Sequence, residues 1–317
     1  MSRDKDQLLK QGKADPNVLS RSVYRILGER REQAPASFIE TESSGVLPGY
    51  LACARAANAC LASFVTPKVL STSILLPPRT MESALREIER QICSLADALH
   101  LTVHSGHTEV SPVLTRPVVT ACVSGEPMKH TVVNPSPGDG IYFAGKAGLA
   151  GTMILAGKKE EELLSRFPAL KVHAMQELRQ ELLIASFAEY FGASSVLVAC
   201  SSCGVMAALW QLAEKTGLGF SVHLDRVPIL QESVEFTELF GINPYEMPSE
   251  GALLLVSSKE LPLTRIGTVE AGRAKQVFVM DEVSSLNRPP QDALTGLYGH
   301  SSGELSVLRI EQCGADR

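Results

Sequence analysis

A glycine-rich loop in the middle of the chain could bind a phosphate. Residues 141–144 are apolar and are predicted as a strand, and residues 149–156 resemble the start of a helix. Gly145, Gly148 and Gly151 lie in the loop and first turn between them. Free backbone N–H groups at a helix start, together with the positive end of the helix dipole, suit an anion. The spacing matches neither the dinucleotide-binding nor the P-loop motif, so tight packing of helix on strand remains an equal alternative.

A polar cluster at residues 104–109, His-Ser-Gly-His-Thr-Glu, follows a short predicted strand at residues 101–104. Gly106 would let a ligand approach the backbone, and Thr108 and Glu109 offer oxygens for a ribose or a metal ion. The two histidines add acid–base capacity near neutral pH but supply at most two metal ligands. The alternative is a capped turn whose side chains face solvent.

Two single residues and one cysteine pair could also bind a ligand or a metal ion or take part in a reaction. Asn58 lies in an apolar small-residue segment, where a buried amide must bind either a ligand or neighbouring backbone. Glu42 follows a predicted strand, a common place for a metal ligand and also for a solvated carboxylate. Cys200 and Cys203 have the spacing of a redox pair or half a zinc site, but no second pair completes a zinc site, and the role of Cys313 is not indicated.

The elements that would position these residues follow from hydrophobic periodicity. The first part mixes helices and strands, and a Pro/Ser/Gly-rich stretch at residues 134–140 then restarts the pattern, which indicates two domains, 1–134 (α+β) and 135–317 (α/β). Helices are predicted at 4–12, 17–31, 50–64, 80–99, 149–156, 160–166, 174–191, 205–216 and 230–240. Strands are predicted at 37–41, 69–75, 101–104, 117–126, 141–144, 194–199, 220–224, 251–257, 274–280 and 305–310.

Composition excludes some classes of function. A net charge of -5 and the absence of a basic stripe argue against a nucleic-acid-binding protein. The apolar runs are too short to span a membrane, and the charged N-terminus is not a signal peptide, so a cytoplasmic location without membrane contact is expected. In that reducing compartment most of the seven cysteines should be buried thiols.

Several of these segments, in this order, resemble one known superfamily. The matching segments are Gly12-Lys13, Ala57-Asn58-Ala59, Ser-Gly-His-Thr-Glu-Val at 105–110, Gly138-Asp139 with Gly-Leu-Ala-Gly-Thr at 148–152, and Phe-Gly-Ile-Asn-Pro at 240–244 with Glu-Gly-Ala-Leu at 250–253. The chain resembles the AIR synthase-like (PurM-like) ATP-binding superfamily. The nearest branch is that of the hydrogenase maturation protein HypE and AIR-synthase-related proteins.

The resemblance implies an α+β fold in two parts. An N-terminal α+β domain would pair with its twin to form a dimeric β-barrel, and a C-terminal α/β domain would pack beside it. ATP with magnesium would lie in the cleft between the two domains. The nucleotide-binding residues carried over are Asn58, Gly106, Thr108, Glu109, Gly148 and Gly151, and the metal ligands are Glu42 and Glu109; no catalytic residue follows.

Departures from the family pattern leave two functions open. Ala59 stands where the family has a metal-binding Asp, and Glu42 replaces another Asp. Residues 200–204 replace an Asp-containing turn, and Cys313 is not a terminal cysteine as in HypE. The chain is therefore expected either to activate an amide or carbonyl oxygen with ATP, or to bind a nucleotide or small ligand as a homodimer without turnover. The second substrate, small molecule or protein, is not indicated.

Overall fold

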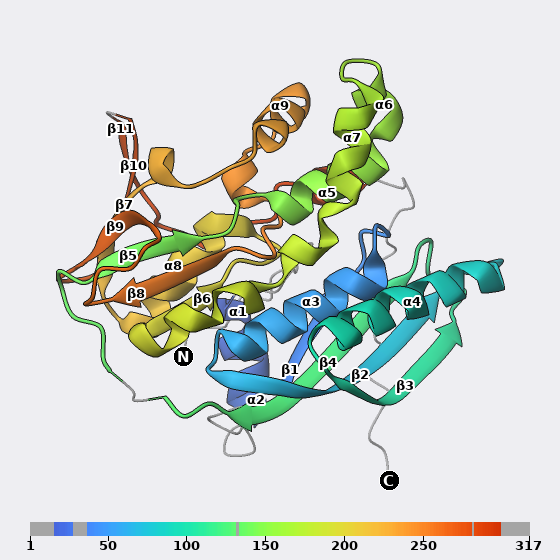
Figure 1. Ribbon diagram of the computed structural model, residues 1–317, viewed down its shortest axis with the longest axis horizontal. Helices are drawn as coiled ribbons and strands as arrows, with labels where there is room; N and C mark the ends of the chain where they lie inside the picture. Colours follow the sequence, from blue (N-terminus) through green and yellow to red (C-terminus); the bar gives the residue numbers. More distant parts are fainter. Residues whose placement is uncertain (1–15, 28–36, 131–132, 281, 299–317) are drawn as a thin grey trace, which may run out of the picture.

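The computed structural model describes residues 16–27, 37–130, 133–280 and 282–298, and its strands form two separate sheets. The first half of the chain builds a four-stranded sheet and the second half a seven-stranded sheet (Figure 1). The chain passes from one to the other between β4 and β5, close to the predicted boundary at residues 134–140.

The four-stranded sheet has the order β1-β4-β2-β3. Strands β2 and β3 are parallel, and the other two pairings are antiparallel. Alternate residues of β4 are buried, because α3 and α4 cover only one face of this sheet (Figure 1). The bounds are β1 (Ser37–Glu42), α3 (Pro48–Leu61), β2 (Val65–Leu76), α4 (Glu82–Ala98), β3 (Thr102–Val110) and β4 (Val118–Pro127).

Helix α3 is the central helix of this half because its side chains are small. Nearly all of its residues are buried, and a Cβ at Gly49 would lie 2.5 Å from the carbonyl oxygen of Ile88 in α4. The small side chains of α3 allow this close approach of the two helices. Before β1, residues Pro16–Leu27 form one short helical stretch, which consists of α1 (Pro16–Leu19), the π-helical turn η1 (Ser20–Tyr24) and α2 (Arg25–Leu27).

The seven-stranded sheet has the order β11-β10-β7-β9-β5-β8-β6. Among its described pairings only β7–β10 is parallel. Helices do alternate with strands along much of this half, as the α/β prediction expected, but the sheet that the strands form is mostly antiparallel. The strands are β5 (Gly140–Ala144), β6 (Val196–Ala199), β7 (Gly219–His223), β8 (Leu253–Ser257), β9 (Thr264–Glu270), β10 (Lys275–Val279) and β11 (Glu282–Ser285).

The helices of the second half differ from prediction chiefly around residues 174–191. A single helix was expected over residues 174–191, but α7 ends at Gln176 and two 3-10 helices follow, with extended Leu183 between them. The elements are α5 (Leu149–Lys158), α6 (Glu160–Leu164), α7 (Ala169–Gln176), η3 (Leu178–Leu182), η4 (Ile184–Ala193), α8 (Gly204–Thr216), η5 (Leu224–Arg226), α9 (Gln231–Phe240), η6 (Pro244–Glu246) and η7 (Thr295–Tyr298).

Two strands were missed, and one predicted turn is a strand. Strands β9 and β11 had no predicted counterpart, and residues 105–110 continue β3 instead of turning. The predicted elements at 4–12, 28–31 and 305–310, and Cys313, lie outside the described residues.

One hydrophobic cluster joins the two halves of the chain. It contains Leu70 of β2 and Ile92 of α4 together with Met153 of α5 and Met247, all buried. The division into domains 1–134 and 135–317 therefore stays a prediction. The four-stranded sheet is open within the described chain, with β1 and β3 as its edges, so the fold is α+β without a closed barrel.

Candidate functional site

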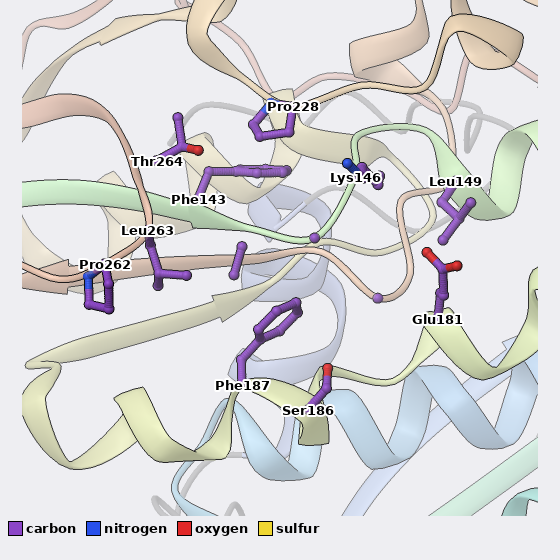
Figure 2. Close-up of a pocket in the computed structure, with 13 residues that line it drawn as sticks. Phe143, Lys146, Leu149, Glu181, Ser186, Phe187, Pro228, Pro262, Leu263 and Thr264 are labelled. Carbon is purple, nitrogen blue, oxygen red and sulfur yellow. The ribbon is translucent and has the colours of Figure 1, made fainter.

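A cavity of about 530 Å³ opens where β5 ends and the glycine loop begins. Its size lies within the range of small-molecule sites. Figure 2 shows that its wall comes from the β5–α5 loop, from η3 and η4, and from the segment before β9. The side chains that line it include Phe143, Lys146, Leu149, Glu181, Ser186, Phe187, Pro228, Pro262, Leu263 and Thr264.

Two glycines with positive φ let three backbone segments meet beside this cavity. Gly145 has φ +85°, and a Cβ there would lie 2.4 Å from the carbonyl oxygen of Gly251. Gly251 has φ +87°, and a Cβ there would lie 1.9 Å from the carbonyl oxygen of Glu181. Neither contact tolerates a side chain, so the shape of the site depends on glycine at both positions.

The cavity contains one cation and one carboxylate. Lys146 is half-buried and makes no hydrogen bond or ion pair with any described residue. Glu181 is exposed at the same end, near Leu149 (Figure 2). Phe187 and Leu263 supply apolar surface. This arrangement can hold a ligand that has an anionic group near Lys146 and an apolar part against Phe187.

The two glycines predicted to bind phosphate do not offer free amides. The N–H of Gly148 donates to Ser249 Oγ (2.8 Å), and the N–H of Gly151 donates to the carbonyl of Pro248 (2.7 Å). Both glycines are buried, and a Cβ on either would collide with Met247. The expectation of free amides is wrong for this pair, because the turn before β8 occupies them. That this loop binds phosphate stays a prediction. The hydrogen-bond donors to the phosphate would then be other groups, such as Lys146.

Asn58 binds backbone in the described chain. Its Nδ2 donates to the carbonyl of Leu182 (2.8 Å), and its Oδ1 accepts from the N–H of Ile184 (3.0 Å). The amide therefore satisfies the two backbone groups at the break between η3 and η4. The side chain of Asn58 thus binds neighbouring backbone, as one of the two alternatives for this buried amide predicted. The two hydrogen bonds lie where the helix predicted over 174–191 is interrupted. A nucleotide contact from Asn58 stays a prediction.

Gly106, Thr108 and Glu109 lie on β3, whose residues are all exposed. Side chains alternate along a strand, so Thr108 and Glu109 point to opposite faces of the sheet. Thr108 lies opposite Ile74, which is buried beneath the helices, whereas Glu109 pairs with His107 on the other face (Nε2 to Oε2, 3.3 Å). A single ligand bound on one face cannot contact both side chains.

The two predicted metal ligands are far apart within one chain. Glu42, Val119, Ile74 and Thr108 lie in register across the four strands. Three strand spacings separate β1 from β3 by about 14 Å, and Glu109 points to the face away from Glu42. The two carboxylates therefore cannot bind the same magnesium ion within one protomer, since ligand oxygens lie about 2 Å from that ion. Among the described residues no group of three or more His, Cys, Asp or Glu side chains could hold a metal.

Glu42 belongs instead to a buried ion cluster that the sequence analysis did not find. Arg55 of α3 pairs with Glu42 and with Glu250 (Nε to Oε1, 2.5 Å), and it donates to the carbonyl of Thr41 (3.1 Å). Burial alone would lower the pKa of Arg55, but the carboxylates of Glu250 and Glu42 outweigh burial and raise it. An arginine inside an otherwise apolar small-residue helix was the signal that could have indicated this cluster.

The two cysteines of the 200–204 segment, Cys200 and Cys203, are not joined by a disulfide. Cys200 is buried and Cys203 is partly buried. Burial, and then the charge of Glu250, raises the pKa of Cys200 well above its usual value. A buried thiol with a raised pKa is unreactive at neutral pH.

Comparisons with known proteins identify a relative by sequence and several structures with a similar fold. No protein-family model matches the chain. A Methanocaldococcus jannaschii protein named for hydrogenase expression and formation is 22% identical over 215 residues, which are 67% of this chain and 62% of that protein. The chain therefore spans less than two thirds of the length of this relative.

Two solved structures match over most of their length. HypE in complex with ATP superposes with a TM-score of 0.64 at 18% identity, covering 89% of this chain and 97% of HypE. ThiL complexed with AMPPCP and TMP gives a TM-score of 0.65 at 17% identity, with 84% and 94% covered. The chain has the PurM-like fold of HypE and ThiL. This confirms the resemblance in fold that was drawn from the sequence. Within the described chain, no helix has the length and apolar character needed to cross a membrane.

Proposed function

We propose that this PurM-like chain binds ATP or a related nucleotide, with the phosphates close to Lys146. Both HypE and ThiL, whose fold it shares, are described in complex with ATP or the ATP analogue AMPPCP. The observation that carries the proposal is the cavity at the end of β5, which contains a lysine without a partner among the described residues. An ammonium beside a phosphate forms a charge-assisted hydrogen bond in partly dry surroundings.

The residues of this cavity suggest how a nucleotide would be held. Lys146 would bind a phosphate oxygen, and Phe187 and Leu263 would contact an apolar part of the ligand. Asn58, Gly106, Thr108, Glu109, Gly148 and Gly151 remain proposed nucleotide-binding positions, with Gly148 and Gly151 shaping the loop and only one of Thr108 and Glu109 able to contact a given ligand through its side chain. The predicted magnesium ligand Glu42 does not line this cavity and is already paired with Arg55, so the proposal is limited to the nucleotide.

Whether the protein also transfers a phosphate from ATP is a separate question. Two observations favour binding without turnover. An enzyme that phosphorylates an amide or carbonyl oxygen must polarise the transferred phosphate. Glu42 is neutralised by Arg55, and Thr108 and Glu109 point to opposite faces of β3. We therefore propose nucleotide binding as the function, with ATP-dependent activation of an amide or carbonyl oxygen as the second candidate.

Calorimetry tests the nucleotide site. ATP is titrated into the protein with magnesium and with EDTA. Lys146→Ala should weaken binding by about 10- to 100-fold, which is the loss of one charged hydrogen bond. Lys259→Ala removes an exposed lysine outside the cavity and should bind like wild type. Absence of binding at millimolar ATP, or equal affinity in both variants, would contradict the proposal, and steady ADP release with any candidate substrate would favour the enzyme.

We also propose that the chain forms a homodimer through the face of the four-stranded sheet that α3 and α4 do not cover. Ile39 of β1 points to that face and is 66% exposed, and the next residues of β1 on the same face, Ser37 and Thr41, are polar. Light scattering coupled to gel filtration should give a dimer for wild type and a monomer for Ile39→Lys. Val113→Lys, in an exposed loop, is the control. A wild-type monomer at micromolar concentration would refute the dimer and leave the nucleotide proposal standing.

A further inference from the structure

The cavity at the end of β5 contains two opposite charges that do not pair with each other. Lys146 lies in the loop after β5, Glu181 lies near the end of η3, and both line the cavity. Within the described chain the side chain of Glu181, like that of Lys146, has neither a hydrogen-bond partner nor an ion-pair partner. A cation and a carboxylate that stay apart in one cavity leave room for a ligand that contacts both.

The backbone of Glu181 is held on both sides, although its side chain is exposed. Its carbonyl oxygen lies so close to Gly251 that a Cβ there would come within 1.9 Å of it. The carbonyl of the next residue, Leu182, accepts a hydrogen bond from Nδ2 of Asn58 (2.8 Å), and Leu182 is fully buried. A carboxylate on a fixed backbone is well suited to orient a ligand, because little of the chain must be ordered on binding.

The position of Glu181 in the cavity restricts what it can bind. Figure 2 shows Lys146 and Glu181 on one side of the cavity and Leu263 on the other, with Phe187 between them. A phosphate at Lys146 brings negative charge towards Glu181, which repels it. The carboxylate therefore needs a part of the ligand that donates hydrogen bonds and connects the phosphate to the apolar part. In a nucleotide, the ribose with its 2′- and 3′-hydroxyl groups is that part.

We propose that Glu181 accepts hydrogen bonds from the 2′- and 3′-hydroxyl groups of the bound nucleotide, and that the site therefore selects ribonucleotides over deoxyribonucleotides. This role rests on the proposed nucleotide site with its phosphates at Lys146. Lys146 would then bind the phosphates, Glu181 the ribose, and Phe187 would present an aromatic ring to the base.

The chemistry of a carboxylate explains the selectivity. An ionised carboxylate has two oxygens that only accept hydrogen bonds, so it fits a pair of neighbouring hydroxyl donors. Hydrogen bonds to a charged acceptor are shorter and stronger than those between neutral groups. A site built to bind a hydroxyl group disfavours the analogue that lacks it, because the acceptor then loses its partner.

Calorimetry with ATP, 2′-deoxy-ATP and 3′-deoxy-ATP tests the role of Glu181. The wild-type protein should bind ATP about tenfold more tightly than either deoxy analogue, which is the loss of one hydrogen bond to a charged group. Glu181→Ala should bind all three nucleotides about equally. Repulsion between the carboxylate and the phosphates is the same for the three nucleotides, so it cancels in the ratio of their affinities.

Two further variants control this experiment. Glu177→Ala removes an exposed carboxylate outside the cavity and should keep the wild-type preference for ATP. Glu181→Gln keeps an acceptor oxygen without the charge and should keep part of that preference. Equal binding of ATP and both deoxy analogues by the wild type, or a preference that persists in Glu181→Ala, would overturn this role and leave the proposed nucleotide site standing. Absence of binding of all three nucleotides at millimolar concentration would overturn both.

Discussion

Replacing Arg55 by methionine is the most direct test of the buried ion cluster. Methionine keeps much of the side-chain length but removes the charge and the donors. Glu42 and Glu250 are 2% and 0% exposed, so neither can recover its lost partner from solvent. Breaking a buried ion pair by removing one partner costs about 3–5 kcal/mol. Against a total stability of about 5–15 kcal/mol, this is a large share of the free energy of unfolding.

Urea unfolding followed by circular dichroism measures the loss at pH 8. Adding Glu42→Gln and Glu250→Gln to Arg55→Met should restore much of the stability, since no unpaired charge then remains. Arg90→Met serves as the control, because Arg90 forms only an exposed pair with Glu87 and should change stability by less than about 1 kcal/mol.

Two outcomes would contradict this reasoning. A loss of less than about 1 kcal/mol in Arg55→Met would mean that the carboxylates find other partners. A triple variant no more stable than the single one would mean that packing, and not charge, explains the effect.

Three further expectations concern single residues. Asn58→Ala should lower the free energy of unfolding by about 2–4 kcal/mol in urea, because it leaves two buried backbone groups without partners; a loss below 1 kcal/mol would mean that water replaces the amide. Gly251→Ala should lower the melting temperature clearly more than Gly272→Ala, which has a similar φ but no atom within 4 Å of the new Cβ. In the native protein at pH 8, Ellman's reagent should react with exposed Cys93 and leave buried Cys200 unmodified until the chain unfolds.

Much of the fold was predictable, because hydrophobic periodicity reflects burial. The amphipathic pattern of α4 and the small-residue pattern of α3 each predicted a helix within a few residues of its bounds. Strand β9 was missed because buried and exposed residues alternate irregularly along it, and β11 was missed because all of its residues are exposed. Residues 105–110 were taken for a turn because of their polarity, but an edge strand can be polar on both faces when nothing covers it.

The candidate site was predictable only in part, since its properties depend on contacts between distant segments. The sequence located the glycine loop, and the cavity does open there. It could not show that the turn before β8 occupies the amides of Gly148 and Gly151, because that turn lies about a hundred residues away along the chain. The pairing of Glu42 with Arg55 and Glu250 depends in the same way on tertiary packing.

The hydrophobic cluster shared by the two sheets affects how the chain can be divided. Leu70 and Ile92 of the first half belong to the same buried hydrophobic cluster as Met153 and Met247 of the second half. Neither half expressed alone would have a complete core, and each should aggregate or stay unfolded. A protease cut in the connection between β4 and β5 should instead leave two fragments that migrate together under native conditions, as a non-covalent complex that retains the fold.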